Sequence, residues 1–385
     1  MSGFTQPADQ EARDLAAAAA LSPATGNERR PVDGPTDLLG LPQDKLAAVL
    51  EPHLDRPFRA GQIYRALYEQ DVDSFESMTG LPKALRSRLA EHFVISTPEI
   101  TARHESADGT VKYLFGLADG ATIEAVDIPD GRRRTLCLSS QAGCALACRF
   151  CVTGYWGAGR NLTAGEIVAQ VRAIRRVPRQ ETHGLNLVFM GMGEPLLNLP
   201  ALEDALEILF QQISWRRMTL STAGVIPGIE AMARWPRRPR LAISLHAPDD
   251  ERRSELMPIN RRYPLRDLVP VLRRFPLGPK ERITFEYILI DGWNDAPADA
   301  DLLAELLAGV RAKVNLIPLN PDPVLDPRLQ TPSPGRVDAF RRRLLDRGLL
   351  ATTRRQRGDD VSAACGQLRV PGRTPRGFRR SKLSL

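Results

Sequence analysis

The run Thr135-Leu-Cys-Leu-Ser-Ser-Gln-Ala-Gly-Cys144-Ala-Leu-Ala-Cys148-Arg-Phe-Cys151 decides the fold of this chain. Its first part, residues 135–140, predicts a strand, and its second part places three cysteines within eight residues. Three closely spaced thiolates can hold three corners of a four-iron cluster and leave the fourth iron open to a small molecule. The alternative is a zinc site completed by a histidine or another cysteine. Structural zinc sites usually pair two Cys-x2-Cys knuckles, and the sequence has no second knuckle.

Strands and helices alternate along the chain that follows this run. Such alternation indicates parallel strands joined by crossover helices. Six units are too few for the usual eight-unit barrel, so we expect an α/β fold with a partial (β/α)6 barrel and its chemistry at the C-terminal ends of the strands. The predicted strands are 135–140, 185–190, 218–222, 241–246, 283–290, 313–319 and 350–357, and the predicted helices are 164–175, 202–212, 265–274, 300–311 and 337–345.

The remaining chain divides by its pattern into four further segments. Residues 1–35 have no apolar period and predict a mobile tail. Residues 36–95 predict a small helical domain, and residues 96–130 alternate as a short β connector. The barrel with its C-terminal cysteine loop then occupies residues 131–368. Residues 369–385 form a basic tail that contains six Arg or Lys residues and no acidic one.

Composition narrows the class of protein. The 385 residues are 43% hydrophobic and 26% charged, which excludes a disordered chain or a collagen. No apolar run approaches the roughly 20 residues of a membrane helix, and the N-terminus lacks a secretory pattern, so we expect a cytoplasmic protein. Five cysteines, an odd number, exclude a secreted disulfide scaffold. The net charge of +7 allows an anionic partner.

A second motif, Met190-Gly-Met-Gly193-Glu194-Pro195, follows the second predicted strand. Its glycines let the backbone approach a ligand closely, and Glu194 can accept hydrogen bonds from an ammonium group. With the cysteine motif, this arrangement resembles the radical S-adenosylmethionine (SAM) enzymes. The resemblance implies one [4Fe-4S] cluster on Cys144, Cys148 and Cys151, with SAM bound at the open iron.

Residues 36 to 370 more closely resemble the adenine C2-methyltransferases that modify both 23S ribosomal RNA and transfer RNA. The resemblance includes the contexts of two outlying cysteines, Cys137 and Cys365, which by themselves would be interpreted as small buried hydrophobic residues. Other matching segments are 58–64, 78–86, 160–162, 220–224, 242–248, 257–260 and 314–321.

The resemblance implies covalent catalysis, because adenine C2 is an electron-poor carbon that does not attack a methyl group itself. Cys365 takes a methyl from one SAM, and a radical derived from a second SAM removes a hydrogen from that methyl. The resulting carbon radical adds to adenine C2, one electron is lost, and Glu124 removes the C2 proton. Cys137 then attacks the sulfur of Cys365 and releases the product, leaving a disulfide. From the sequence pattern alone, Glu124 would be an exposed strand carboxylate.

The resemblance also implies the SAM contacts and the partners. The implied SAM contacts all lie at or just beyond the ends of predicted strands, and they are Gly193, Glu194, Ser221, Ser244, Leu245, His246 and Asn320. Without the resemblance, His246 would be interpreted as a histidine of the protein core. The partners are 23S rRNA, tRNA and an electron donor such as flavodoxin or ferredoxin, and we expect a monomer. Candidate RNA contacts, for which a solvated surface is the alternative, are Arg56, Arg59, Arg65, Lys83, Arg86, Arg88 and residues 132–134.

Two other functions fit the same motifs. A related enzyme that methylates adenine C8 and gives resistance to ribosome-targeting antibiotics would share all five cysteines, although Arg357-Gly-Asp-Asp and Gly193-Glu-Pro-Leu favour the C2 enzyme. A non-catalytic RNA-binding protein with a structural metal is the alternative from another class. The sequence departs from the C2 family at Tyr155-Trp156, at Trp293 and in residues 322–334.

Overall fold

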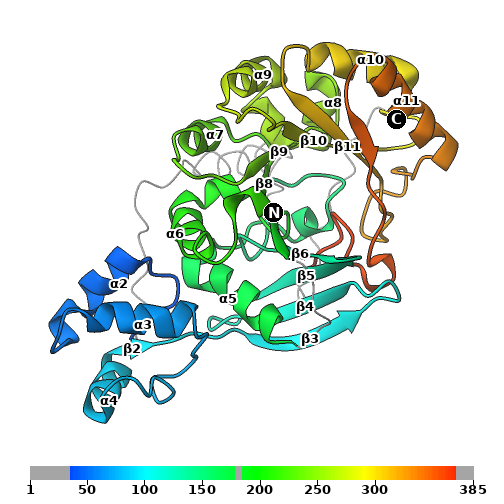
Figure 1. The fold of residues 1–385 in the computed structure, drawn as a ribbon. Helices are drawn as coiled ribbons and strands as arrows, with labels where there is room; N and C mark the ends of the chain where they lie inside the picture. Colours follow the sequence, from blue (N-terminus) through cyan, green and yellow to red (C-terminus); the bar gives the residue numbers. More distant parts are fainter. Residues whose placement is uncertain (1–34, 178–183, 370–385) are drawn as a thin grey trace, which may run out of the picture.

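A curved sheet with helices on its outer side and a small helical lobe at one end make up the computed structural model (Figure 1). The structure describes residues 35–177 and 184–369. The predicted tails, apart from residues 35 and 369, lie outside the described residues. No described helix is long and apolar enough to cross a membrane.

The parallel part of the sheet confirms the partial (β/α)6 barrel. Seven parallel strands lie side by side in chain order, and they are β6 (Arg133–Cys137), β7 (Leu185–Phe189), β8 (Met218–Thr222), β9 (Arg240–Ser244), β10 (Ile283–Leu289), β11 (Ala312–Pro318) and β12 (Ala351–Thr353). Six crossovers connect them, carried by α5 (Ala164–Arg176), α6 (Leu199–Leu209), α7 (Ile226–Ala233), α9 (Leu265–Arg274), α10 (Pro297–Leu306) and α11 (Pro334–Asp346). In Figure 1 these helices cover the outer face of the curved sheet, as crossover connections require.

Two helices of the barrel are absent from the sequence prediction. The third crossover, α7, begins Ile226-Pro-Gly, and these residues are more typical of a turn. The short helix α8 (Asp250–Leu256) is almost entirely polar, so it shows no apolar period, yet the side chain of Asp249 caps it by accepting from the backbone N–H of Arg252 at 2.8 Å.

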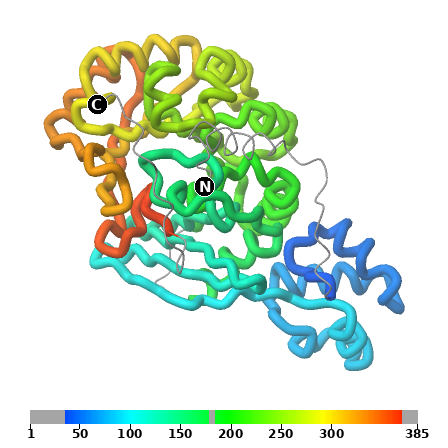
Figure 2. The backbone as a smooth tube through the Cα atoms, turned by 180° about the vertical axis from the view of Figure 1, so that it is seen from behind, coloured from blue at the N-terminus to red at the C-terminus, as the bar shows by residue number. Residues whose placement is uncertain are grey.

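The segment expected to be a connector extends the barrel sheet. Strands β3 (Glu99–Glu105), β4 (Val111–Gly116) and β5 (Thr122–Asp130) form an antiparallel meander at one edge. Strand β5 pairs antiparallel with β6, with Val126 opposite Cys137. Figure 2 shows this meander beneath the barrel, with the C-terminal segment lying against it. The pairing brings β5 next to the strand that precedes the cysteine loop.

The N-terminal helical lobe contains α2 (Gln43–Leu50), α3 (Arg59–Tyr68) and α4 (Lys83–His92), with a two-stranded sheet of β1 (Thr36–Asp37) and β2 (Phe93–Val94). Helix α5 holds the lobe against the barrel. Arg172 and Arg176 of α5 bind the carboxylate of Asp71 at 2.5 and 2.8 Å. A Cβ on Gly40 would lie 2.0 Å from the backbone nitrogen of Gly165, so only glycine allows this close approach.

Candidate active site

The structure brings the predicted site residues to one edge of the sheet, where the C-terminal ends of the parallel strands meet. Glu124 lies within β5, and Cys137 is the last residue of β6. The others lie at the ends of strands or in the loops that follow them, namely Cys144, Cys148 and Cys151 after β6, Gly193 and Glu194 after β7, Ser221 in β8, Ser244 in β9, Leu245 and His246 after β9, Asn320 after β11, and Cys365 beyond β12.

The cysteine loop after β6 has the local chemistry of a metal-ligand loop. Cys148 is buried, Cys144 and Cys151 are partly buried, and each thiol lies within electrostatic range of at least one other. Burial, with a smaller contribution from the neighbouring Cys151, raises the pKa of the Cys144 thiol to about 12. Thiols in such a place stay protonated at neutral pH unless a cation binds them, which a cationic cluster does.

The spacing of these three cysteines bears on whether they bind a single metal ion or an iron–sulfur cluster. Among the described residues, no three His, Cys, Asp or Glu side chains are grouped as ligands of a single metal ion. The ligands of an iron–sulfur cluster bind different irons, and therefore they stand further apart than ligands that share one ion. The three thiols share one loop, and the Cys-x3-Cys-x2-Cys spacing along the chain allows each of them to bind a different iron.

The loop after β7 is held tightly against the loop after β6. Gly193 has φ +100°, and a Cβ there would lie 2.5 Å from the Cβ of Gln141, so glycine is required by a protein contact rather than by a ligand. The carboxylate of buried Glu194 accepts backbone N–H bonds from Leu196 at 3.1 Å and from Ala223 at 2.7 Å. Burial still raises its pKa to about 7. Glu194 therefore ties the β7 and β8 loops together in addition to any contact with a ligand.

His246 follows β9 in a left-handed backbone conformation, with φ +61°. Its Nδ1 accepts a hydrogen bond from the backbone N–H of Ile288 at 3.0 Å, and burial lowers its pKa to about 3. The imidazole is therefore neutral, with the proton on Nε2. Its ring packs edge-on against Phe150 of the cysteine loop, with centroids 4.4 Å apart.

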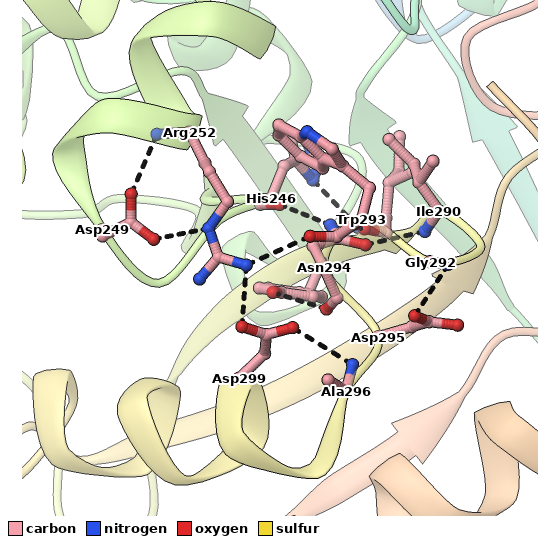
Figure 3. Close-up of polar contacts among 12 residues, drawn as sticks. His246, Asp249, Arg252, Ile290, Gly292, Trp293, Asn294, Asp295, Ala296 and Asp299 are labelled. Carbon is pink, nitrogen blue, oxygen red and sulfur yellow. Dashed lines mark hydrogen bonds and ion pairs between the residues drawn. The ribbon is translucent and has the colours of Figure 1, made fainter. Parts of the chain in front are cut away.

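A buried amide that the sequence analysis did not identify supports this histidine. Asn294 donates to the carbonyl oxygen of His246 at 2.8 Å and to that of Ile288 at 2.6 Å, and it accepts from the N–H of Ile290 at 2.7 Å (Figure 3). Trp293, a bulky departure from the family pattern, is buried in the same turn. The turn after β10 therefore fixes the turn after β9.

Arg253 on α8 is a second buried residue that the sequence pattern does not reveal. Its guanidinium donates to three carbonyl oxygens at the ends of β8 and β9, those of Ala223 (2.6 Å), Ser244 (3.0 Å) and Leu245 (3.1 Å). It also donates to the side-chain oxygen of Asn260 in the turn after α8 at 2.6 Å. Nearby, the hydroxyl oxygens of Ser221 and Ser244 are 3.5 Å apart. One arginine thus holds together the strand ends that carry these two serines.

The C-terminal loop carries Cys365 into the same edge of the sheet. The side chain of Asn320 donates to the carbonyl oxygen of Cys365 at 3.0 Å. The segment 152–156, where the sequence departs from the family, docks the loop, because Val152 N–H donates to Gly366 at 2.6 Å and the Thr153 hydroxyl donates to Leu368 at 2.7 Å. Cys365 lines a cavity together with the end of β11 and the chain after β12, and it lies within electrostatic range of both Cys137 and Cys151.

Comparisons with known proteins agree with this geometry. Residues 138–303 match the radical SAM superfamily, and residues 36–95 match the ribosomal RNA large subunit methyltransferase N-terminal domain. The dual-specificity RNA methyltransferase RlmN of Anaeromyxobacter dehalogenans is 46% identical over 353 residues, which cover 88% of this chain and 93% of that protein. RlmN of Halorhodospira halophila is 46% identical over 347 residues, or 89% and 95% of the two chains. The chain belongs to the dual-specificity RNA methyltransferase family.

A solved structure supports the same assignment. The crystal structure of a radical SAM methyltransferase from Sphaerobacter thermophilus superimposes with a TM-score of 0.81 at 44% identity, covering 87% of this chain and 99% of that one. Membership of the radical SAM superfamily implies an iron–sulfur cluster and SAM. The residues of the cysteine loop fit such a cluster by number, burial and spacing.

In this methyltransferase Glu124 is buried, with 4% of its surface exposed, whereas the sequence pattern alone predicts an exposed carboxylate. Its Oε1 lies 3.2 Å from Nζ of Lys112, and its Oε2 accepts the backbone N–H of Arg369 at 2.8 Å. Burial raises the pKa of Glu124, and Lys112 opposes that rise. The C-terminal segment therefore covers the carboxylate.

The structure also sorts the candidate RNA contacts. Arg134 binds the fully buried carboxylate of Asp127 at 2.8 Å, which makes it a structural residue, whereas Arg132 and Arg133 are exposed. In the helical lobe, Arg59 pairs with Asp55 at 2.6 Å. Of the candidate cations of the lobe, Arg56, Arg65, Lys83 and Arg88 are exposed, whereas Arg86 is partly buried and donates to the carbonyl oxygen of Glu76.

Proposed function

We propose that this enzyme methylates carbon 2 of adenine in 23S rRNA, at the peptidyl-transferase centre, and in tRNA, at the adenine next to the anticodon. The observation that carries the proposal is the placement of Cys137 and Cys365. These cysteines lie outside the cluster loop and come from distant parts of the chain, yet they are within electrostatic range of each other at the strand ends. The relatives are dual-specificity RNA methyltransferases, which supports two classes of RNA substrate.

The five cysteines then divide into two sets. Cys144, Cys148 and Cys151 would hold a [4Fe-4S] cluster, which supplies the electron that cleaves SAM to a 5′-deoxyadenosyl radical when both are bound. Cys365 accepts a methyl group and carries it to the adenine. Glu124 removes the C2 proton, and Cys137 attacks the sulfur of Cys365, releasing the methylated base and leaving a disulfide that a reducing cytoplasm can restore.

The other site residues bind the two SAM molecules used in each turnover. Ser221, Ser244, Leu245 and His246 line the ends of β8 and β9, while Gly193, Glu194 and Asn320 lie in neighbouring loops. Neutral His246 presents an Nε2–H donor to the ligand. The exposed cations of the helical lobe contact RNA phosphates. We further propose that the enzyme acts as a cytoplasmic monomer that takes electrons from a flavodoxin or ferredoxin.

The decisive experiment is anaerobic reconstitution with iron, sulfide, SAM and a reductant, followed by mass spectrometry of nucleosides from unmodified rRNA and tRNA. We expect 2-methyladenosine from both RNAs, and none with the Cys365→Ala variant. A product of 8-methyladenosine would assign the related C8 activity instead. Colourless protein that contains zinc and lacks iron would favour the non-catalytic metal protein.

The role of Cys137 has its own test. The Cys137→Ala variant should accumulate RNA bound covalently through Cys365, because nothing attacks the sulfur of the adduct. The Cys137→Ala/Cys365→Ala double variant is the matched control and should carry no bound RNA. The absence of a crosslink in the single variant would reject the role assigned to Cys137.

A further inference from the structure

Arg354, the residue after β12, has a guanidinium group that no ion pair occupies within the described chain. Its backbone N–H donates to the carbonyl oxygen of Leu316 on β11 at 2.8 Å, which fixes the position of the residue beside the sheet. Its side chain is partly buried and lines the same cavity as Cys365.

The charges around Arg354 come from several elements. Cys365 on the C-terminal loop, Glu286 on β10 and Cys137 on β6 all lie within electrostatic range, and ionised Cys365 has the largest effect in raising the pKa of Arg354. Glu286 has another partner, because its carboxylate accepts from the side-chain nitrogen of Asn315 at 2.7 Å. Lys313 on β11 acts on Glu286 rather than on the cysteines. Burial raises the pKa of Glu286 and Arg354 opposes that rise, so this guanidinium faces one buried carboxylate and two thiols.

Other cations near the site have partners of their own or are exposed. Arg357 lines the same cavity but pairs with Asp108 and Asp130, and Arg355 lines it but is exposed. Lys112 binds the carboxylate of Glu124 and the carbonyl of Ser362 at 3.3 Å. Arg253 donates to three carbonyl oxygens at the strand ends and to the side chain of Asn260. His246 is neutral because burial lowers its pKa to about 3. Arg354 is therefore the cation placed to compensate a negative charge on Cys365.

We propose that Arg354 is the positioning residue that stabilises the thiolate of Cys365 and aims its sulfur for methyl transfer. The proposal rests on the proposed function. In the step that it serves, the Cys365 thiol first gives its proton to solvent. An electron pair of the sulfur then forms the new S–CH3 bond while the bond between the methyl and the SAM sulfonium breaks. A thiolate and a sulfonium become two neutral thioethers, S-methylcysteine and S-adenosylhomocysteine.

The physical reason is the cost of a negative charge in a partly buried loop. Desolvation disfavours a thiolate, and an opposite charge within about 4–6 Å favours it by roughly 1–3 pH units. A guanidinium also fixes direction, because its N–H groups lie in one plane. Arg354 can supply both effects from a strand end that the sheet holds still.

The test measures the reactivity of Cys365 itself. Reconstituted holoenzyme, shown by mass to carry unmethylated Cys365, is treated with iodoacetamide across a pH series, and alkylation of the Cys365 peptide is quantified. In Arg354→Met and Arg354→Gln we expect the midpoint of the alkylation curve to rise by about one pH unit or more. Arg354→Lys should recover part of the shift. Arg343→Met, which removes an exposed charge on α11 outside this cavity, should leave the midpoint where it is.

Two outcomes separate this inference from the proposed function. Equal midpoints in the wild type and in both neutral Arg354 variants would overturn the role of Arg354, whatever the enzyme methylates. Mass spectrometry after incubation with SAM reports the methyl on Cys365 independently. If wild-type Cys365 gains no methyl, the proposed function fails, while the alkylation curves still decide whether Arg354 stabilises the thiolate. Because Gln keeps polar contacts that Met loses, a folding defect confined to Arg354→Met leaves the test intact.

Discussion

Replacing Arg253 by Met should destabilise the barrel at the ends of β8 and β9. The side chain is completely buried and donates to four oxygens, three of which are backbone carbonyls. Met fills much of the same space but donates nothing. The carbonyls of Ala223, Ser244 and Leu245 would then lie unsatisfied in the interior.

The magnitude follows from two opposing contributions. Each unsatisfied buried polar group lowers the free energy of unfolding by about 1–3 kcal/mol, so four such groups set a large upper limit to the loss of stability. The substitution also removes a buried cation, and burial already lowers the pKa of Arg253 to about 10, which shows that the charge is held at a cost. Measured losses on removing one partner from a buried charged network are about 3–5 kcal/mol, and we expect a decrease of that size in the free energy of unfolding.

The assay is urea denaturation under anaerobic conditions, with Arg252→Met as the matched control. Arg252 is the neighbouring residue on α8, but it is partly exposed, and its ion pairs with Asp249 and Asp299 should contribute up to about 1 kcal/mol each. The midpoint of Arg253→Met should therefore fall well below that of the control. Coincident midpoints would refute the argument that these buried oxygens depend on Arg253.

Three further substitutions probe the site. Gly193→Ala should weaken SAM binding at least tenfold, because its Cβ would clash with the neighbouring loop, while Gly335→Ala, in open space on α11, should leave the affinity unchanged. Lys112→Met removes the charge that opposes the raised pKa of Glu124, so the acid limb of single-turnover methylation should move to higher pH, and an unmoved limb would contradict this role. Asn294→Ala leaves two carbonyls and one N–H without a partner, so titration with SAM should show weaker binding, and an unaltered affinity would count against the support we assign to this turn.

Much of this site can be predicted from the sequence, because the residues of its two central motifs are close together along the chain. Three cysteines within eight residues lie close together in space in any fold. A glycine-rich turn directly after a strand lies at the end of that strand. The alternation of strands and helices then predicts that the strand ends meet at one edge. On this basis the barrel and the set of residues at its C-terminal edge follow from the sequence.

Individual roles depend on partners that are distant in the chain. Glu124 lies in an alternating strand whose pattern suggests exposure, yet Arg369 N–H closes over its carboxylate from the far end of the chain. Arg134 belongs to a basic run, yet its guanidinium binds the buried carboxylate of Asp127.

The roles of two arginines of the site also depend on contacts that the sequence does not reveal. Arg253 and Arg354 lie in polar or mixed segments that have no motif, and nothing in their spacing distinguishes them from surface residues. The sequence by itself determined that the cysteine loop and the glycine-rich turn lie at strand ends, because local spacing and the alternation of strands and helices fix that, and the family resemblance implied the other site residues. Only the tertiary structure decided which charges are buried and which group each one faces, because burial and pairing arise from contacts between segments that the chain brings together on folding.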